Sequence, residues 1–331
     1  MKAIVQDRYG APEVLRMVDL PVPAPGPGEV LVRVGASAVG TGDWRLRAAA
    51  FPGIMAVPGR LMFGILGPRA RVPGQDFAGT IAAVGAGVTR FLPGDRVFGT
   101  GMSGAHAEYL AMPEDAAIAA TPEGLSDLEA AALPFGAVTA VTFLRDVAKV
   151  RPGDRVLIVG ASGGVGSIAV QVAASMGAQV TGLASGGNLD LVRGLGVEEA
   201  LDYRRVDVTA RQAQRFDVIL DTVGALSWRK ARRILSPGGR FVPLNFGVGD
   251  MLAALLPVRG GRRMRLAISQ GSAPLMAEIA GMAATGAIRP VIDRVYGLRE
   301  IRAAHAHVEA RHRAGAVVID VAGAEALARA A

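Results

Sequence analysis

The chain has 331 residues, 51% of them hydrophobic, no cysteine, and 36 Lys and Arg against 29 Asp and Glu, which gives a formal net charge of +7. The length predicts two domains, and the absence of cysteine excludes disulfides and thiolate metal sites. The longest apolar runs, around residues 61–66 and 251–258, are less than half of the about 20 residues that a membrane helix needs. No signal peptide opens the sequence, so we expect a cytoplasmic protein without a membrane span.

The first 122 residues are predicted to be rich in β-strands. Short strands are expected over residues 2–6, 29–36, 79–84 and 96–99, separated by clusters of Pro and Gly such as residues 21–28. The basic residues are scattered among acidic ones rather than gathered in an arm or an aromatic-rich patch. This distribution argues against nucleic acid as a partner.

A different pattern begins near Pro122, where strands start to alternate with helical spacers. This alternation predicts right-handed crossovers and a doubly wound parallel sheet. After a helix over 274–284, two strands flank a helix over 298–312, and this last segment is expected to return to the first domain. The predicted domains are therefore 1–122 with 287–331, and 123–286. The expected strands of the second half are 156–159, 180–184, 200–202, 217–221, 240–244, 265–269, 291–295 and 317–321.

One glycine-rich run is the most informative motif. The strand ending at Val159 leads directly into GASGGVG, from Gly160 to Gly166. Its first, fourth and seventh residues are glycines, which permit a tight turn, a close approach of the backbone to a pyrophosphate and close packing of helix on strand. A helical pattern and a second strand follow and complete a βαβ unit. The run predicts a dinucleotide site with the phosphates at the helix N-terminus; the alternative is an ordinary glycine-rich turn.

Other motifs extend along nearly the whole chain in a familiar order. PGQDFAG at 73–79, FLPGDRVFG at 91–99, Pro134 with Thr139, the glycine run and PGG at 237–239 together resemble the medium-chain dehydrogenase/reductase superfamily. The resemblance implies an α/β protein in which a GroES-like, β-rich catalytic domain embraces a Rossmann cofactor-binding domain. It also implies that the active site lies in the cleft between them.

Two departures from the family pattern concern zinc. Zinc-dependent members carry a Cys-x-Thr-Asp-like element and a Gly-His-Glu element, whereas residues 40–43 here read GTGD and residues 74–76 read GQD. Catalytic zinc needs three protein ligands, and both the thiolate and the imidazole are missing. The chain therefore resembles the zinc-independent, quinone-oxidoreductase-like branch, and we expect no metal.

The catalytic residues are less well defined. Gly40 replaces an Asn that is common in this branch, and Phe51 stands where related enoyl reductases place a tyrosine proton donor. Asp43 and His106 remain as polar candidates for catalysis, although Asp43 is also explained as a structural hydrogen-bond partner and His106 as a histidine at a domain edge. We interpret His305, His307 and His312 as a solvated helix face rather than a metal site, since residues two apart on a helix point in different directions.

The second strand of the βαβ unit indicates which dinucleotide is bound. NAD-specific sites place Asp or Glu about 20 residues beyond the glycine run, but here the strand leads into Ser185, Gly186, Gly187 and Asn188. A serine there can donate to a 2′-phosphate, and the resemblance implies that Tyr203 approaches the same phosphate and that Thr139 lies beside the nicotinamide. Both side chains are alternatively explained as packing residues. NADPH is the expected cofactor, held by Gly160, Ser162, Gly163, Gly164, Val165, Gly166, Ser185, Asn188, Tyr203 and Thr139.

The expected chemistry is hydride transfer. Without zinc, no strong Lewis acid polarises a carbonyl, which favours quinones and activated enones over simple carbonyl compounds. Apolar residues within 44–71 (Phe51, Ile54, Met55, Leu61, Met62, Phe63 and Ile65) and within 251–256 fit a substrate pocket, or equally a core or a dimer face. We predict an NADPH-dependent reductase of a small apolar quinone, enone or carbonyl substrate, working as a homodimer. The alternative is an NADPH-binding sensor or structural protein without significant turnover.

Overall fold

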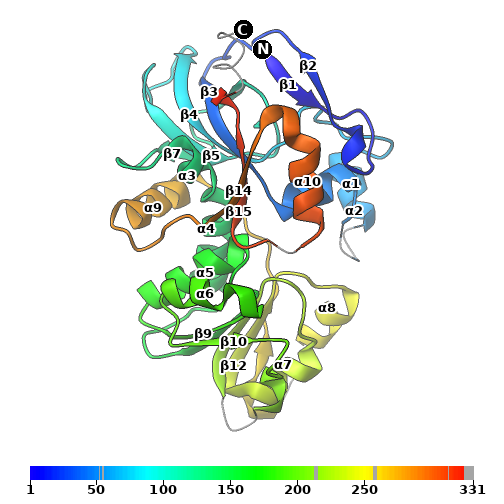
Figure 1. Ribbon diagram of the computed structural model, residues 1–331, viewed down its shortest axis with the longest axis vertical. Coiled ribbons are helices and arrows are strands. Elements are labelled where there is room, and N and C mark those ends of the chain that lie inside the picture. Colours follow the sequence, from blue (N-terminus) through cyan, green and yellow to red (C-terminus); the bar gives the residue numbers. More distant parts are fainter. Residues whose placement is uncertain (52, 54–55, 212–214, 256–258, 312, 324–331) are drawn as a thin grey trace.

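The chain forms two lobes, each built on its own sheet (Figure 1). The structure is a computed structural model that describes residues 1–51, 53, 56–211, 215–255, 259–311 and 313–323. Ile54, Met55, Leu256 and His312, which the sequence analysis singled out, lie outside the described residues.

The lower lobe in Figure 1 contains a six-stranded sheet in which all neighbouring strands are parallel. This confirms the doubly wound parallel sheet, and the order is that of a Rossmann fold. Along β8, Val156 and Ile158 enter one core cluster while Leu157 and Val159 enter another, because successive side chains of a strand point to opposite faces. In spatial order the strands are β10 (Glu199–Asp202), β9 (Gln179–Ala184), β8 (Arg155–Val159), β11 (Phe216–Asp221), β12 (Leu235–Pro243) and β13 (Arg263–Met264).

The last of these strands differs from the prediction. Residues 265–269 were expected to form it, but the ladder with β12 covers only Arg240↔Arg263 and Phe241↔Met264. It ends with the bond from Arg265 N–H to Phe241 O (2.8 Å), and residues 265–270 leave the sheet. The apolar residues of that run predicted a strand, but the run follows the edge of the sheet, where no strand among the described residues pairs with it.

The helices of this lobe are α4 (Pro134–Val141), α5 (Gly164–Ser175), α6 (Leu189–Gly194), α7 (Trp228–Ile234), α8 (Val248–Leu255) and α9 (Ala273–Ala284). A π-helical stretch over Thr142–Val147 continues α4. The packing of α4 against α5 encloses the larger of the two cores and holds the glycine run at the upper edge of the sheet.

The upper lobe is a mainly antiparallel β-structure. Its seven-stranded sheet joins β15 (Ala316–Asp320) to β3 (Glu29–Val39) in antiparallel register, so the C-terminal segment adds to the sheet of the N-terminal segment. The remaining strands are β14 (Ile292–Gly297), β4 (Asp76–Val84), β5 (Arg96–Thr100), β6 (Tyr109–Pro113) and β7 (Ile118–Ala120), with a separate pair β1 (Lys2–Val5) and β2 (Arg16–Asp19).

Short helices cover this lobe. They are α1 (Thr41–Ala48), α2 (Ala56–Phe63), α3 (Asp127–Ala131) and α10 (Ile301–Glu309), and α10 is shorter than the helix expected over 298–312 because Leu298–Glu300 forms a 3-10 turn. Within the described part of the chain, no helix is long and apolar enough to cross a membrane.

Candidate active site

The glycine run lies between β8 and α5, at the point where the strand order of the sheet reverses. Ligands of open α/β sheets bind at this switch point. Gly160 has φ +81°, and a Cβ there would lie 2.6 Å from Thr222 Oγ1. A Cβ on Gly166 would lie 2.0 Å from Gly160 O. The first and last glycines are therefore required by the turn itself and by the contact of helix with strand.

Gly163 is different, because a Cβ there would meet only Gly160 O, at 3.5 Å. It is the N-cap of α5, and the first bond that spans a full helical turn runs from Ser167 N–H to Gly163 O (2.8 Å). The N–H groups of Gly164, Val165 and Gly166 precede that bond, so they have no partner within the helix. Donors of this kind at the positive end of a helix suit a pyrophosphate, and the space over Gly163 fits the approach of one.

The predicted ribose-binding residues gather at the neighbouring strand end. Asn188 Nδ2–H donates to Ser162 Oγ (3.1 Å), which joins the glycine run to the segment after β9. Tyr203 N–H donates to Ala184 O (3.1 Å) and its side chain is 50% exposed. Ser185 is half-buried.

Sequence analysis missed a carboxylate at this place. Asp202 ends β10, and a Cβ on Gly186 would lie 2.6 Å from its Oδ2. The absence of Asp or Glu after β9, the second strand of the βαβ unit, was therefore incomplete evidence for NADPH, since the neighbouring strand β10 supplies Asp202. Asp202 Oδ1 accepts Arg204 N–H (2.9 Å), and Arg205 Nε lies 3.8 Å from Oδ2, so part of its charge is offset locally. The strand order, which places β10 beside β9, is the signal that identifies it.

Helix α4 connects the cofactor loop to the upper lobe. Thr139 is buried, and its Oγ1 lies 3.4 Å from Ser269 Oγ. Phe135, one turn earlier on the same helix face, lies 3.6 Å from the Cβ position of Gly42. Gln75 Oε1 lies 2.3 Å from that same position. The amide of Gln75 thus fills the space over Gly42, and no zinc-ligand side chain stands there.

Asp43 extends from this corner to a cavity. Its Oδ2 accepts Gly40 N–H (2.7 Å), and among the described residues no hydrogen bond reaches Oδ1. Asp43 lines a cavity of about 240 Å³ whose apolar wall includes Tyr9, Leu46, Met62 and Phe63. Burial raises the pKa of Asp43 to about 7, because a charged carboxylate loses its hydration there. A carboxyl group with this pKa still carries a proton in part of the molecules at neutral pH, where an ordinary aspartate is ionised.

A second buried carboxyl group, which the sequence analysis did not select, lies close by. Asp76 accepts Phe135 N–H at Oδ2 (3.0 Å), at the start of α4. Burial, followed by the nearby charge of Asp43, raises the pKa of Asp76 to about 7. Asp76 does not line the cavity, which makes it a neighbour of Asp43 rather than a second proton donor.

His106 is fully buried at 0% exposure. Its Nδ1 lies 3.0 Å from Ser37 Oγ, and its ring meets the ring of His305 edge-on at 5.8 Å between centroids. Burial lowers the pKa of His106 to about 3, so it is neutral at physiological pH. It lies inside the upper lobe rather than at a domain edge, and it does not line the cavity.

His305 and His307 have separate surroundings. His305 is buried rather than solvated, so the prediction of a solvated face is wrong for this residue: its ring packs inward from α10. His307 Nε2 pairs with Asp293 Oδ2 (2.6 Å). Among the described residues there is no group of three His, Cys, Asp or Glu placed to hold a metal ion.

Two contacts join the lobes beside the glycine run. Gly163 forms a β-bridge with Gly315, just before β15. Arg45, on α1, donates to Asn245 Oδ1, after β12. The guanidinium of Arg45 thus bonds across the boundary between the two lobes rather than solvating a loop. Contacts between residues 200 positions apart, such as this one, leave no local pattern in the sequence.

The predicted pocket residues separate into two groups. Met62 and Phe63 line the cavity beside Asp43, and Phe51 stacks on Phe63 with 5.7 Å between ring centroids. Leu61 and Ile65 are exposed. The segment over 44–71 therefore contributes both pocket lining and surface.

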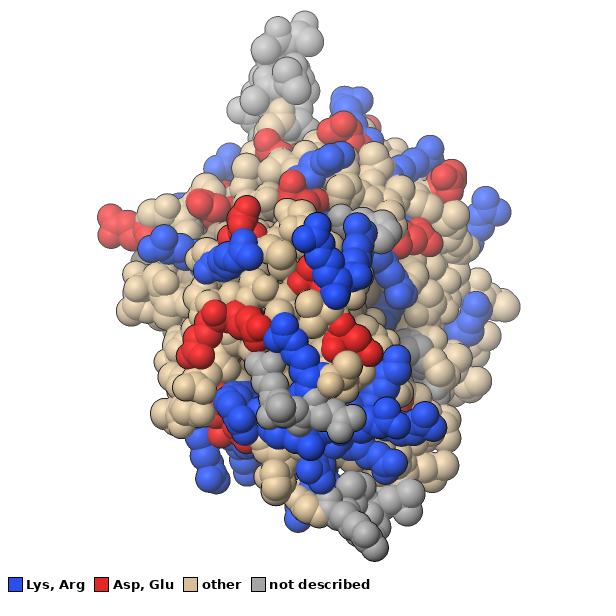
Figure 2. Space-filling model, turned by 60° about the horizontal axis from the view of Figure 1, so that its bottom comes forward, with Lys and Arg blue, Asp and Glu red and all other residues tan. Residues whose placement is uncertain are grey.

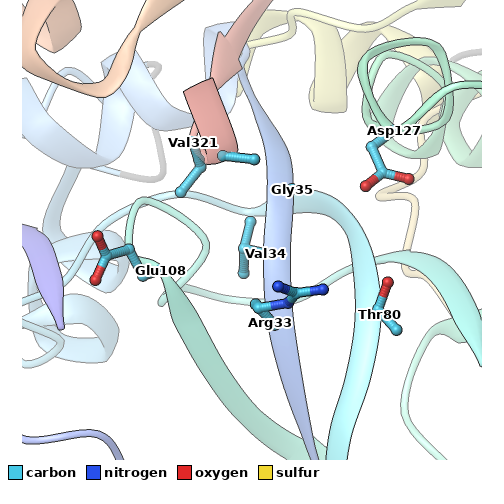
Figure 3. Close-up of a pocket in the computed structure, with 8 residues that line it drawn as sticks. Arg33, Val34, Gly35, Thr80, Glu108, Asp127 and Val321 are labelled. Atoms are coloured by element: carbon cyan, nitrogen blue, oxygen red, sulfur yellow. The ribbon is translucent and has the colours of Figure 1, made fainter. Parts of the chain in front are cut away.

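A smaller hollow of about 120 Å³ opens elsewhere on the upper lobe (Figure 3). Arg33, Thr80, Glu108 and Asp127 surround it, and none of the predicted site residues does. Glu108 accepts Lys2 N–H (2.6 Å), and Asp127 pairs with Arg96 (2.6 Å). Both carboxylates thus have partners outside the hollow, and we do not include it in the candidate site.

Comparisons with known proteins agree with this layout. Residues 26–123 match the family model of the alcohol dehydrogenase GroES-like domain, and residues 195–319 match that of the zinc-binding dehydrogenase. The chain is 32% identical over 359 residues to the mitochondrial NAD(P)H oxidoreductase RTN4IP1 of Mus musculus, covering 97% of this chain and 89% of that protein. A match to the pikromycin polyketide synthase component PikAII of Streptomyces venezuelae is 34% identical and covers 76% of this chain but 7% of that protein.

Among solved structures, the quinone oxidoreductase from Coxiella burnetii is similar over 97% of this chain and 99% of its own, with a TM-score of 0.84 and 29% identity. The GroES-like and Rossmann-like architecture expected from the motifs is thereby confirmed.

Proposed function

Because the chain belongs to the medium-chain dehydrogenase/reductase superfamily, in its quinone-oxidoreductase-like branch, and is thus an NAD(P)H-dependent oxidoreductase, we propose that it uses NADPH to reduce a quinone or an activated enone without zinc. The observation that carries this proposal is the joint placement of an open glycine cradle and, near the start of α4, a buried carboxyl group with a raised pKa. The bound nicotinamide supplies the hydride.

The residues around the cradle bind and orient. The N–H groups of Gly164, Val165 and Gly166 donate to the pyrophosphate, and Gly163 lets it approach the backbone. In this proposal Thr139, with Ser269 Oγ 3.4 Å from its Oγ1, binds the nicotinamide end. Phe63 and the exposed Met62 give the cavity an apolar wall against which an apolar substrate packs.

Asp43 supplies the proton that the reduced product requires. In this proposal Asp43, which lines the cavity and whose buried Oδ1 has no hydrogen-bond partner within the described part of the chain, donates its proton to the substrate oxygen or carbanion. Gly40 N–H holds Oδ2 and so fixes the direction of Oδ1. The tyrosine donor of related enoyl reductases, absent here, is then unnecessary. His106 is assigned a structural role because it is buried away from the cavity.

The substrate class is tested by comparing acceptors at saturating NADPH. Quinones and enones should react faster than unactivated aldehydes, since hydride addition to them needs no Lewis acid. A strong preference for simple aldehydes would contradict the proposed substrate class and leave the cofactor assignment intact.

NADPH should bind more tightly than NADH. In this proposal Ser185 and Arg205 donate to the 2′-phosphate, whereas the charge of Asp202 opposes it. Ser185→Asp should weaken NADPH by at least about 10-fold through like-charge repulsion and affect NADH less, and Asp202→Asn should strengthen NADPH. Equal affinity of the wild type for both cofactors in a fluorescence titration, unchanged in both variants, would contradict the assignment.

The purified protein should contain no stoichiometric zinc. Gly40 and Gln75 stand where the family places its thiolate and imidazole ligands, and the described residues offer no other metal cluster. A chelator should therefore change neither the rate of NADPH oxidation nor the melting temperature. One zinc per chain by elemental analysis, with activity lost on its removal, would show that this proposal is wrong.

The homodimer and the cytoplasmic location stay predictions. Sedimentation velocity of the purified protein measures the first, and fractionation of cells that produce it measures the second.

A further inference from the structure

The charge of the protein and the opening of its cavity lie in different places. Residues 201–270 contain 13 Lys and Arg but only 5 Asp and no Glu, so the basic residues are not scattered in this part of the sequence. Figure 2 shows Lys and Arg side chains gathered over the end of the lower lobe, which this segment helps to build. The upper lobe carries, beside the cavity, a group of exposed apolar side chains in α2 and the residues that follow it.

Helix α2 has one face that packs inward and one that lies in solvent. A Cβ on Gly59 would lie 2.6 Å from the ring of Phe51, and Phe51 also stacks on Phe63, one turn after Gly59. Positions 59 and 63 therefore form the inward face. Val57 and Leu61, which are also one turn apart, lie on the opposite face and are 69% and 55% exposed. The solvent side of α2 thus carries large apolar side chains.

The turn after α2 extends this apolar surface. Ile65 and Leu66 are 59% and 95% exposed. Arg60 Nη1 donates to Ile65 O (3.2 Å), and Tyr9 OH donates to Gly64 O (2.8 Å), so the turn is bound to the helix and to the N-terminal segment. The guanidinium of Arg60 lies 5.3 Å from the centre of the Tyr9 ring. We define the α2 patch as the four exposed apolar residues Val57, Leu61, Ile65 and Leu66.

Two methionines join the α2 patch to the cavity. Met62 and Met102 line the same cavity as Asp43, yet they are 56% and 62% exposed, which places them at its opening. Met62 follows Leu61 directly in α2, so the patch begins at this opening. The cavity measures about 240 Å³, whereas sites that enclose a whole drug-sized ligand span about 300 to 1,000 Å³. A longer substrate must therefore extend through the opening and past Met62.

We propose that the α2 patch binds a hydrocarbon tail of the acceptor while the reacting quinone or enone lies in the cavity beside Asp43. This inference rests on the proposed function, because it extends the substrate of the same cavity. An alkyl chain laid on the patch removes apolar surface of both partners from water, and the flexible methionines at the opening adapt to its course. The tail is favoured over a second protein or a bilayer because Met62 belongs to both the cavity wall and α2, so one molecule occupies both places.

Acceptors that differ only in the length of an alkyl chain test this site. With alkyl benzoquinones and alkyl vinyl ketones whose chains run from one to eight carbons, KM should fall at least about 10-fold along each series, because each added methylene loses contact with water, while kcat stays nearly constant. Leu61→Gln/Ile65→Gln should remove most of this fall and leave KM for the one-carbon acceptors unchanged. The melting temperature should stay the same, since both side chains are exposed. Calorimetry with a saturated octyl ketone, without NADPH, measures binding of the tail independently of turnover.

The control variant removes exposed apolar side chains elsewhere on the upper lobe. Val22→Gln/Leu92→Gln changes two residues that are 48% and 69% exposed and do not line the cavity, and it should keep the full dependence on chain length. An equal loss in this control would overturn the tail site, as would oxidation of NADPH with a KM that ignores chain length. The site is also overturned if Leu61→Gln/Ile65→Gln only converts a dimer to a monomer, or only abolishes binding to phospholipid vesicles. Binding of the saturated ketone without turnover of any acceptor would support the tail site and contradict the proposed function.

Discussion

Gly163→Val is expected to weaken NADPH binding by at least about 100-fold, equivalent to about 2.7 kcal/mol, while the protein stays folded. A Cβ at this position meets only Gly160 O at 3.5 Å, and the backbone angles of φ −76° and ψ 173° suit any residue. The new side chain projects instead into the space needed by the pyrophosphate. Fluorescence titration measures the affinity, and circular dichroism with thermal melting reports the fold.

Two other glycines make that experiment specific. Gly281→Val, in α9, introduces the same side chain where no atom lies within 4 Å and should leave NADPH affinity unchanged. Gly166→Val places a Cβ 2.0 Å from Gly160 O and should destabilise the lobe itself. If Gly163→Val bound NADPH normally with a native spectrum, the cofactor would not lie on this loop.

Asp43→Asn is expected to lower kcat by about 100-fold or more, within the range that general acid catalysis contributes, and to leave the Kd for NADPH unchanged. Asparagine retains an oxygen for Gly40 N–H, so the start of α1 is preserved, but it has no acidic proton to give. In the wild type the rate should fall as pH rises through about 7, because the carboxyl group with its raised pKa then loses the proton. Stopped-flow measurement of NADPH oxidation across pH separates this step from product release.

Asp76→Asn is the matched control for the proton donor. It removes a neighbouring carboxyl group that does not line the cavity, so it should shift the pH profile toward lower pH and keep most of kcat. Equal losses of kcat in the two variants would assign Asp43 a structural role.

The same pKa shifts have a consequence for stability. Folded Asp43 and Asp76 hold their protons above the unfolded value of 3.8, so the stability that they contribute is fully present below about pH 4 and is lost as pH rises through about 7. Between pH 5 and pH 8 the free energy of unfolding of Asp43→Asn should therefore fall by less than that of the wild type. The variant has about one fewer buried carboxyl group that must ionise in the folded state.

Local sequence patterns predicted the fold well where the residues of one element determine its structure. The run from Gly160 to Gly166 lies between a strand and a helix, as its spacing indicates, and the β8 strand is buried on both faces as its continuous apolar letters require. The sequence was less informative about segments that become strands only if a distant strand pairs with them. The strand predicted over 265–269 is wrong because an apolar run at a sheet edge has the same residue pattern as one inside the sheet.

Contacts between distant segments escaped sequence analysis for the same reason. Asp202 reaches the end of β9 only because β10 pairs beside it, and Asp76 approaches Asp43 only after β3 and β4 align. The choice of Asp43 rested on its place next to a family motif. Its distinguishing properties, an Oδ1 without a partner among the described residues and a place in the cavity wall, exist only in three dimensions.

The bound cofactor is expected to be used for turnover rather than only sensed. Steady-state NADPH oxidation by the wild type, with quinones and enones as acceptors and with Gly163→Val as the matched blank, tests it most directly. We predict continuous oxidation with at least one quinone or enone that Gly163→Val does not support. Tight NADPH binding without oxidation above the blank for any acceptor would contradict the account and establish a sensor or structural role.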